Sequence, residues 1–114
     1  MKETLIQQGD ICLADLNPVK GHEQGGFKPV LILQNNRLNE HLNTAIIAPI
    51  TSNLQMQGYS TTYFLEKKIS QLSQDSVALL FQIRTLDKKR LKKRVSNLDK
   101  ETFREVKGRM ALVF

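Results

Sequence analysis

The 114-residue sequence has little of several residue types that whole classes of protein require. It contains one cysteine, Cys12, two histidines and no tryptophan. A lone cysteine cannot form an internal disulfide, and it fits a reducing compartment. Two histidines and one cysteine at unrelated positions give no zinc ligand spacing, and no acidic cluster suggests magnesium or calcium. The sequence therefore predicts neither a disulfide framework nor a metal site.

Long hydrophobic runs are also absent. The longest are PVLIL and TAIIAPI, well short of the roughly 20 apolar residues that a membrane-spanning helix needs. The N-terminal stretch MKETLIQQGD has no apolar core of the kind found in signal peptides. We therefore expect a cytoplasmic protein that does not enter a membrane. The length, without repeats or a linker, predicts a single domain over residues 1–114.

The positive charge is concentrated in the last third of the chain. The formal net charge is +6, and the range 88–109 holds ten Lys/Arg against three Asp/Glu, with the densest run in KKRLKKR. Such a block attracts phosphates or acidic peptides. A charge run can equally be a solvated face that only keeps the protein soluble. The sequence leaves both interpretations open.

Hydrophobic patterning predicts a mainly β protein. Strands are expected at residues 9–16, 29–35, 44–51, 60–66 and 74–85, with a brief strand at 95–98 after a helical turn in the basic run. Pro49 is expected to place the end of the third strand at an edge or a bulge. Residues 17–27 should form a long glycine-containing loop, residues 36–43 a loop or irregular turn, and residues 53–58 a second loop.

The clearest predicted helix closes the chain. Asp99 is a good N-cap residue, and Leu98 and Phe103 occupy the positions of a hydrophobic staple. Gly108 lies inside this helix and costs about 1 kcal/mol relative to alanine. Five or more short strands and one terminal helix suggest a small β-barrel that is closed or nearly so.

One loop carries side chains that a bend alone does not explain. HEQGGFKP, residues 22–29, places His22, Glu23, Gln24 and Lys28 around two glycines between two predicted strands. The loop leads into a strand, so it is not a phosphate-binding loop of the kind that precedes a helix. Taken singly, His22 could be an exposed loop residue, Lys28 a surface lysine and Thr51 a turn residue.

Three stretches taken together resemble the MazF/PemK family of toxin endoribonucleases: GHEQGGFKPVLIL, APITS and QIRTLDKKRL. The likeness runs in order over nearly the whole chain. It implies an SH3-like barrel of the CcdB/PemK type, and a homodimer that cleaves single-stranded RNA in short sequence contexts without a metal or other cofactor. In such enzymes the substrate 2′-OH attacks the adjacent phosphate and leaves a 2′,3′-cyclic phosphate. A MazE-like antitoxin with an acidic C-terminal segment is the implied partner.

The resemblance also implies roles for individual residues. His22, Glu23, Lys28 and Thr51 correspond to catalytic or site-shaping positions. Asn17, Gln24, Gln82 and Arg84 correspond to positions that contact RNA. Lys28 stands where the family usually has a catalytic arginine, Phe81 where many members have Asp or Glu, and Leu79 where the PemK-like members have a catalytic arginine. These departures make His22 the leading group for proton transfer, because histidine as a residue type can act as acid or base at cellular pH.

Two alternatives to an active ribonuclease follow from the same resemblance. The chain could be a weakened family member that binds RNA or antitoxin without cutting, which Lys28 and Phe81 allow. It could also be a gyrase-binding toxin like CcdB. That alternative is disfavoured because CcdB-type toxins use a C-terminal tryptophan, and this chain ends in MALVF without one.

Overall fold

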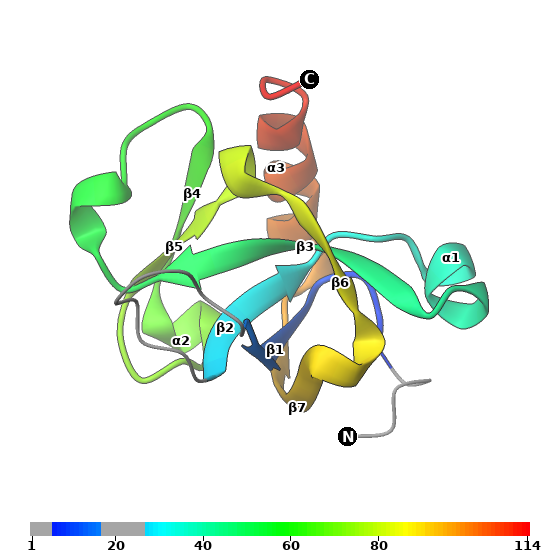
Figure 1. The fold of residues 1–114 in the computed structure, drawn as a ribbon. Coiled ribbons are helices and arrows are strands. Elements are labelled where there is room, and N and C mark those ends of the chain that lie inside the picture. Colours follow the sequence, from blue (N-terminus) through cyan, green and yellow to red (C-terminus); the bar gives the residue numbers. More distant parts are fainter. Residues whose placement is uncertain (1–5, 17–26) are drawn as a thin grey trace, which may run out of the picture.

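The computed structural model describes residues 6–16 and 27–114. Seven strands and three α-helices follow one another along this part of the chain, as Figure 1 shows. The strands are β1 (Asp10–Asp15), β2 (Phe27–Ile32), β3 (Thr44–Thr51), β4 (Thr62–Leu65), β5 (Ser76–Leu79), β6 (Arg84–Asp87) and β7 (Leu91–Asn97). The helices are α1 (Asn36–His41), α2 (Lys67–Ser70) and α3 (Lys100–Met110), and 3-10 turns occupy Leu54–Met56, Leu80–Gln82 and Lys88–Arg90.

The strands form one antiparallel sheet in the order β4-β5-β3-β2-β1-β7, and β6 pairs with the first half of β3. The end strands β4 and β7 are not paired with each other, so the sheet is open in the part of the chain that is described. The predicted mainly β fold with a C-terminal helix is confirmed. A small open sheet of this kind is compatible with the predicted SH3-like barrel, which was expected to be closed or nearly so.

Both faces of the sheet are buried, which explains the nearly continuous apolar runs of the central strands. Ile11, Leu31 and Ala48 face one core, which Phe103 and Val106 of α3 complete. The alternate residues of the same strands face a second core, which includes Cys12, Ala14, Val30, Ile32, Ala45, Ile47, Leu86 and Leu91. The period-2 pattern therefore separates two cores rather than a core from solvent.

Three predicted elements differ in type or extent from the observed ones. Residues 36–43 contain helix α1 rather than a loop, because the side chain of Asn35 accepts the N–H of Leu38 and caps a helix. Residues 74–85 form two strands, β5 and β6, separated by the 3-10 turn. The brief strand predicted at 95–98 begins at Leu91, and α2 was not anticipated.

Pro49 does not lie at a sheet edge. It pairs with Val30 of β2 on one side of β3. On the other side, β6 pairs with Thr44–Ile47 and β5 with Ile50 and Thr51. Proline lacks the N–H that a ladder hydrogen bond needs. Pro49 lies at the point along β3 where the partner strand changes from β6 to β5.

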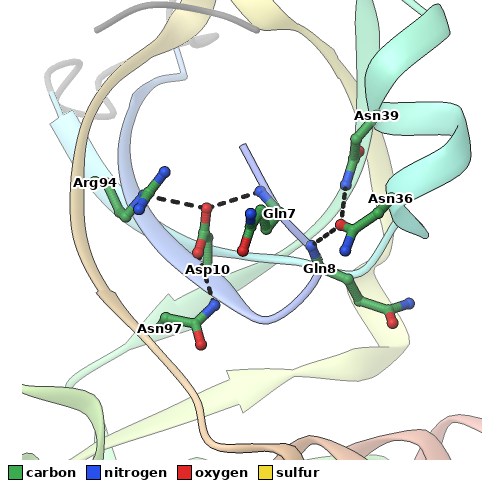
Figure 2. A network of polar contacts seen from close by, with 7 residues as sticks. All are labelled: Gln7, Gln8, Asp10, Asn36, Asn39, Arg94 and Asn97. Atoms are coloured by element: carbon green, nitrogen blue, oxygen red, sulfur yellow. Dashed lines mark hydrogen bonds and ion pairs between the residues drawn. The ribbon is translucent and has the colours of Figure 1, made fainter. Parts of the chain in front are cut away.

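A polar network ties the segment before β1 to α1 and β7, as Figure 2 shows. The fully buried Asp10 carboxylate accepts the N–H of Gln7 and the amide of Asn97, each at 2.8 Å, and lies 3.3 Å from the Arg94 guanidinium. The N–H of Gln8 donates to Asn36 at 2.7 Å. The contacts of Asp10 with β7 and of Gln8 with α1 join separate segments of the chain, so we interpret the network as structural.

The terminal helix is built as predicted. Asp99 caps α3, and its side chain accepts the N–H of Thr102 at 3.2 Å. Leu98 and Phe103 are both buried in the first core, and Met110 and Val113 pack against that core. No helix in the described ranges is long and apolar enough to cross a membrane.

Candidate active site

A cleft of about 750 Å³ opens where the start of β2 lies beside the end of β3. Its described lining comes from β1, β2, β3, the segment 72–76 that leads into β5, and the 3-10 turn that follows β5. The lining residues are Leu13, Leu16, Lys28, Pro29, Pro49, Ile50, Thr51, Ser52, Leu72, Ser73, Gln74, Ser76, Leu79 and Gln82. Three residues singled out in the sequence, Lys28, Thr51 and Gln82, thus share one cleft.

Lys28 is the cation of the described cleft lining. It is the second residue of β2, pairs with Ala14 of β1, and has an exposed side chain. Pro29 follows it and favours the extended backbone that a strand requires. No carboxylate in residues 6–16 or 27–114 forms an ion pair with Lys28. Its ammonium can therefore bind an anion that enters the cleft.

Thr51 ends β3, where it pairs with Val77 of β5. Its half-buried side-chain hydroxyl accepts the N–H of Asn53 at 3.1 Å. A threonine hydroxyl can donate one hydrogen bond while it accepts another. The turn after β3 therefore fixes the Thr51 oxygen and leaves its hydrogen able to bind a phosphate oxygen.

Two residues that the resemblance assigned to RNA contact lie in the 3-10 turn between β5 and β6 and at the start of β6. Gln82, at the end of the turn, is exposed and lines the cleft. Arg84 is exposed on β6, where it pairs with Ile47, and is not part of the described lining. Leu79 lines the cleft from β5, whereas Phe81 is exposed and does not line it.

Four of the predicted site residues, Asn17, His22, Glu23 and Gln24, lie outside the described residues. Their proposed roles therefore stay predictions. In the described lining, Lys28 is the one charged side chain, accompanied by neutral hydroxyls and carboxamides. No group of three or more His, Cys, Asp or Glu side chains comes together in the same part of the chain.

Sequence reasoning missed the polar residues Ser52, Ser73, Gln74 and Ser76 of the lining. The first follows β3 directly, and the other three precede or begin β5. Because β5 runs antiparallel to β3, the residues that enter β5 must lie close to the residues that leave β3. The polar residues at the start of the fifth predicted strand therefore held a usable signal, but only once the pairing of these strands was known.

The C-terminal basic block does not line the cleft. Lys88 is buried, and its ammonium donates to the backbone carbonyl of Asn39. Arg94 is paired with Asp10. Lys89, Lys92 and Lys93 are exposed around the start of β7. The block is thus divided between structural bonds and a solvated surface.

Solved structures of MazF toxins share the fold of this chain. MazF from Deinococcus radiodurans, at 25% identity, superposes with a TM-score of 0.74 over 95% of this chain and 94% of that one. The same toxin in a MazE–MazF structure gives 0.77, again at 25% identity and with 95% and 94% of the two chains covered. The Mycobacterium tuberculosis toxin MazF-mt6, at 23% identity, gives 0.76 and covers 92% and 95%.

A family model supplies the remaining evidence. The model for the PemK-like, MazF-like toxins of type II toxin–antitoxin systems matches residues 7–114. The match includes every described residue of the cleft lining and the positions of His22, Glu23 and Gln24. The chain belongs to the PemK-like, MazF-like family of type II toxin–antitoxin toxins.

Proposed function

We propose that this chain is a metal-independent endoribonuclease that cleaves single-stranded RNA, including mRNA in the cytoplasm. The observation that carries the proposal is the convergence of Lys28, Thr51 and Gln82 on one cleft. An exposed ammonium and a donor hydroxyl suit a phosphodiester, and a carboxamide beside them suits a base or a ribose. Membership of the PemK-like, MazF-like toxin family supports the proposal.

The proposed reaction is transfer of the phosphoryl group within the RNA strand. The ribose 2′-oxygen attacks the adjacent phosphorus while the bond from phosphorus to the 5′-oxygen breaks. The 2′-OH gives its proton to a base, and the 5′-oxygen receives a proton from an acid, so no proton is consumed overall. The products are a 2′,3′-cyclic phosphate and a 5′-OH.

Within this scheme each residue has one task. Lys28 stabilises the charge that develops on the phosphorane oxygens, and Thr51 donates a hydrogen bond to one of them. His22 transfers the proton, and Glu23 orients His22 or Lys28. Asn17, Gln24, Gln82 and Arg84 contact the RNA beside the reacting phosphate. For Arg84, its exposure on β6 is compatible with a contact to RNA that extends beyond the cleft.

We further propose that the toxin acts as a homodimer and is neutralised by an antitoxin with an acidic C-terminal segment. MazF of Deinococcus radiodurans has been solved together with MazE, which supports an antitoxin of that kind here. An acidic segment would compete with RNA for a cleft whose described charge is the Lys28 ammonium.

A second candidate function is binding of RNA or antitoxin without cleavage. Three residues of the chain favour it: Lys28 lacks the bidentate fork of arginine, and Leu79 and Phe81 supply no acid or base. Both functions predict an RNA-binding cleft, so a cleavage assay separates them.

The deciding experiment incubates the purified protein with a mixed pool of single-stranded RNA in excess EDTA. We expect cleavage to persist, with 2′,3′-cyclic phosphate ends detected by mass spectrometry, because the proposed acid–base groups are side chains. Inhibition by EDTA that magnesium reverses would contradict the mechanism. Binding of RNA without any cleavage would establish the second function instead.

A further inference from the structure

The cleft lining divides by chemistry into two parts. Lys28 and Thr51, from β2 and β3, supply a cation and a hydroxyl. The segment 72–76 supplies Ser73, Gln74 and Ser76, which are neutral groups that both donate and accept hydrogen bonds. Phosphate contacts position a nucleic acid, whereas contacts to base edges select its sequence. The division suggests that the two parts of the lining bind different parts of the RNA.

The backbone of the 72–76 segment is fixed at both ends. The carboxylate of Asp75 accepts the N–H of Lys67 at 2.8 Å, and the hydroxyl of Ser76 donates to the carbonyl of Gln74 at 3.0 Å. At the other end, the N–H of Leu72 donates to the hydroxyl of Ser70 at 3.1 Å, and the Leu72 side chain packs on the first core. The segment can therefore present a side chain in a defined place.

The turn that leads into this segment is also constrained. Gln71 adopts a left-handed backbone, with φ of 62°, and its N–H donates to the carbonyl of Lys67 at 2.7 Å. A left-handed residue at this point ends helix α2 and turns the chain toward the cleft. The bonds that hold the segment use backbone groups and the side chains of Ser70, Asp75 and Ser76, and leave the Gln74 side chain unused.

Gln74 is the member of the segment best suited to read a base. Its side chain is exposed, lines the cleft, and makes no hydrogen bond within residues 6–16 and 27–114. It lies three residues before Val77, the β5 partner of Thr51. A glutamine carboxamide offers a donor and an acceptor side by side, which matches the edge of a base such as adenine.

We propose that Gln74 is a specificity residue that selects the base next to the phosphate held by Lys28 and Thr51. The inference rests on the proposed function, because it requires RNA in the cleft. It assigns sequence selection to the segment before β5.

The test compares the wild type with Gln74→Ala and Gln74→Glu on a randomised RNA pool, with the cleavage ends sequenced. We expect Gln74→Ala to reduce the base preference at one position beside the cut by about fivefold or more, the range of a lost two-bond base contact. Gln74→Glu keeps the size but only accepts, so it should shift that preference toward bases that present an amino group. Asn43→Ala, an exposed carboxamide outside the cleft lining, is the matched control.

An unchanged cleavage profile in Gln74→Ala would overturn the inference, and so would an equal loss of cleavage at every sequence. Equilibrium binding of short RNAs that differ in one base provides a readout that does not depend on cleavage. If the wild type binds with a base preference that Gln74→Ala abolishes, yet cuts nothing, the inference holds and the proposed ribonuclease function fails. Binding without any base preference would overturn the inference whatever the cleavage result.

Discussion

At the scale of single residues, the site divides into positions that a sequence can identify and positions that it cannot. Lys28 and Thr51 could be identified because each flanks a strongly apolar strand and matches a family motif. Ser52, Ser73 and Gln74 could not, because a polar residue in a turn has no distinguishing feature until its neighbours in space are known.

Cys12 illustrates how the sheet controls a reactive group. Burial raises the pKa of its thiol to about 12; the charge of Asp10 acts in the same direction and that of Arg94 against it. The thiolate is the nucleophile, so we expect native Cys12 to react with iodoacetamide at pH 8 about 100-fold or more slowly than in urea. Mass spectrometry of the alkylated protein measures both rates. Similar rates in the two states would show that the second core is open.

The same shift predicts how stability depends on pH. The pKa of Cys12 in the folded state lies above its ordinary value near 9, so below that pH the protonated thiol makes its full contribution to the free energy of unfolding. That contribution is lost as the pH rises toward about 12. Burial and the hydrogen bond to Glu105 raise the pKa of Tyr63 to about 12, so Tyr63 changes the stability of the protein in the same direction. The urea midpoint should therefore fall above pH 9, and less steeply in Cys12→Ala.

At the scale of elements, prediction succeeded where apolar residues or a cap define the element. The strands β1 to β4 and helix α3 follow from their sequences. Helix α1 was missed because polar groups hold it: Asn39 is buried, and its amide donates to the carbonyl of Gln34 at 2.9 Å. The 3-10 turn at Leu80–Gln82 was missed because the sequence stays apolar across the break.

Helix α3 provides a test of local backbone energetics. Gly108 is exposed inside the helix, and a Cβ built on it would have no neighbouring atom within 4 Å. Gly108→Ala should therefore stabilise the protein by about 0.5–1 kcal/mol, measured by urea unfolding. Gly9→Ala is the matched control and should destabilise, because Gly9 has φ of +91°. A less stable Gly108→Ala would mean that this helix face is covered in solution.

At the scale of the whole molecule, the uneven charge of the sequence has more than one structural use. Lys88 and Arg94 hold the fold together. Lys92 and Lys93 lie on β7, the last strand of the sheet, and lysines on an edge strand discourage pairing with other chains. The remaining exposed cations can attract RNA or an acidic antitoxin toward the molecule without lining the cleft.

The charge distribution predicts how a partner binds. An acidic antitoxin peptide should bind a dimer with an affinity that decreases as salt increases, because exposed charges are screened. Calorimetry between about 50 and 300 mM salt, with sedimentation at micromolar protein concentration, checks both statements. Affinity that does not change with salt would count against an electrostatic role for these cations, and a monomer would contradict the proposed assembly.

The central claim is that the cleft of Lys28 and Thr51 is where RNA is cut, and substitution of Lys28 tests it most directly. Under single-turnover conditions with saturating protein, Lys28→Ala should reduce the cleavage rate about 100-fold or more, as loss of a strong transition-state donor does. Lys28→Arg should retain or raise the rate, because a guanidinium can bind two phosphate oxygens at once.

Lys107→Ala is the matched control. Lys107 is exposed on α3, outside the cleft lining, and its substitution should change the rate by less than about twofold. Circular dichroism and sedimentation confirm that each variant is folded and has the wild-type assembly. We expect a large loss of the cleavage rate in Lys28→Ala alone. A folded Lys28→Ala protein that cleaves RNA at the wild-type rate would contradict it.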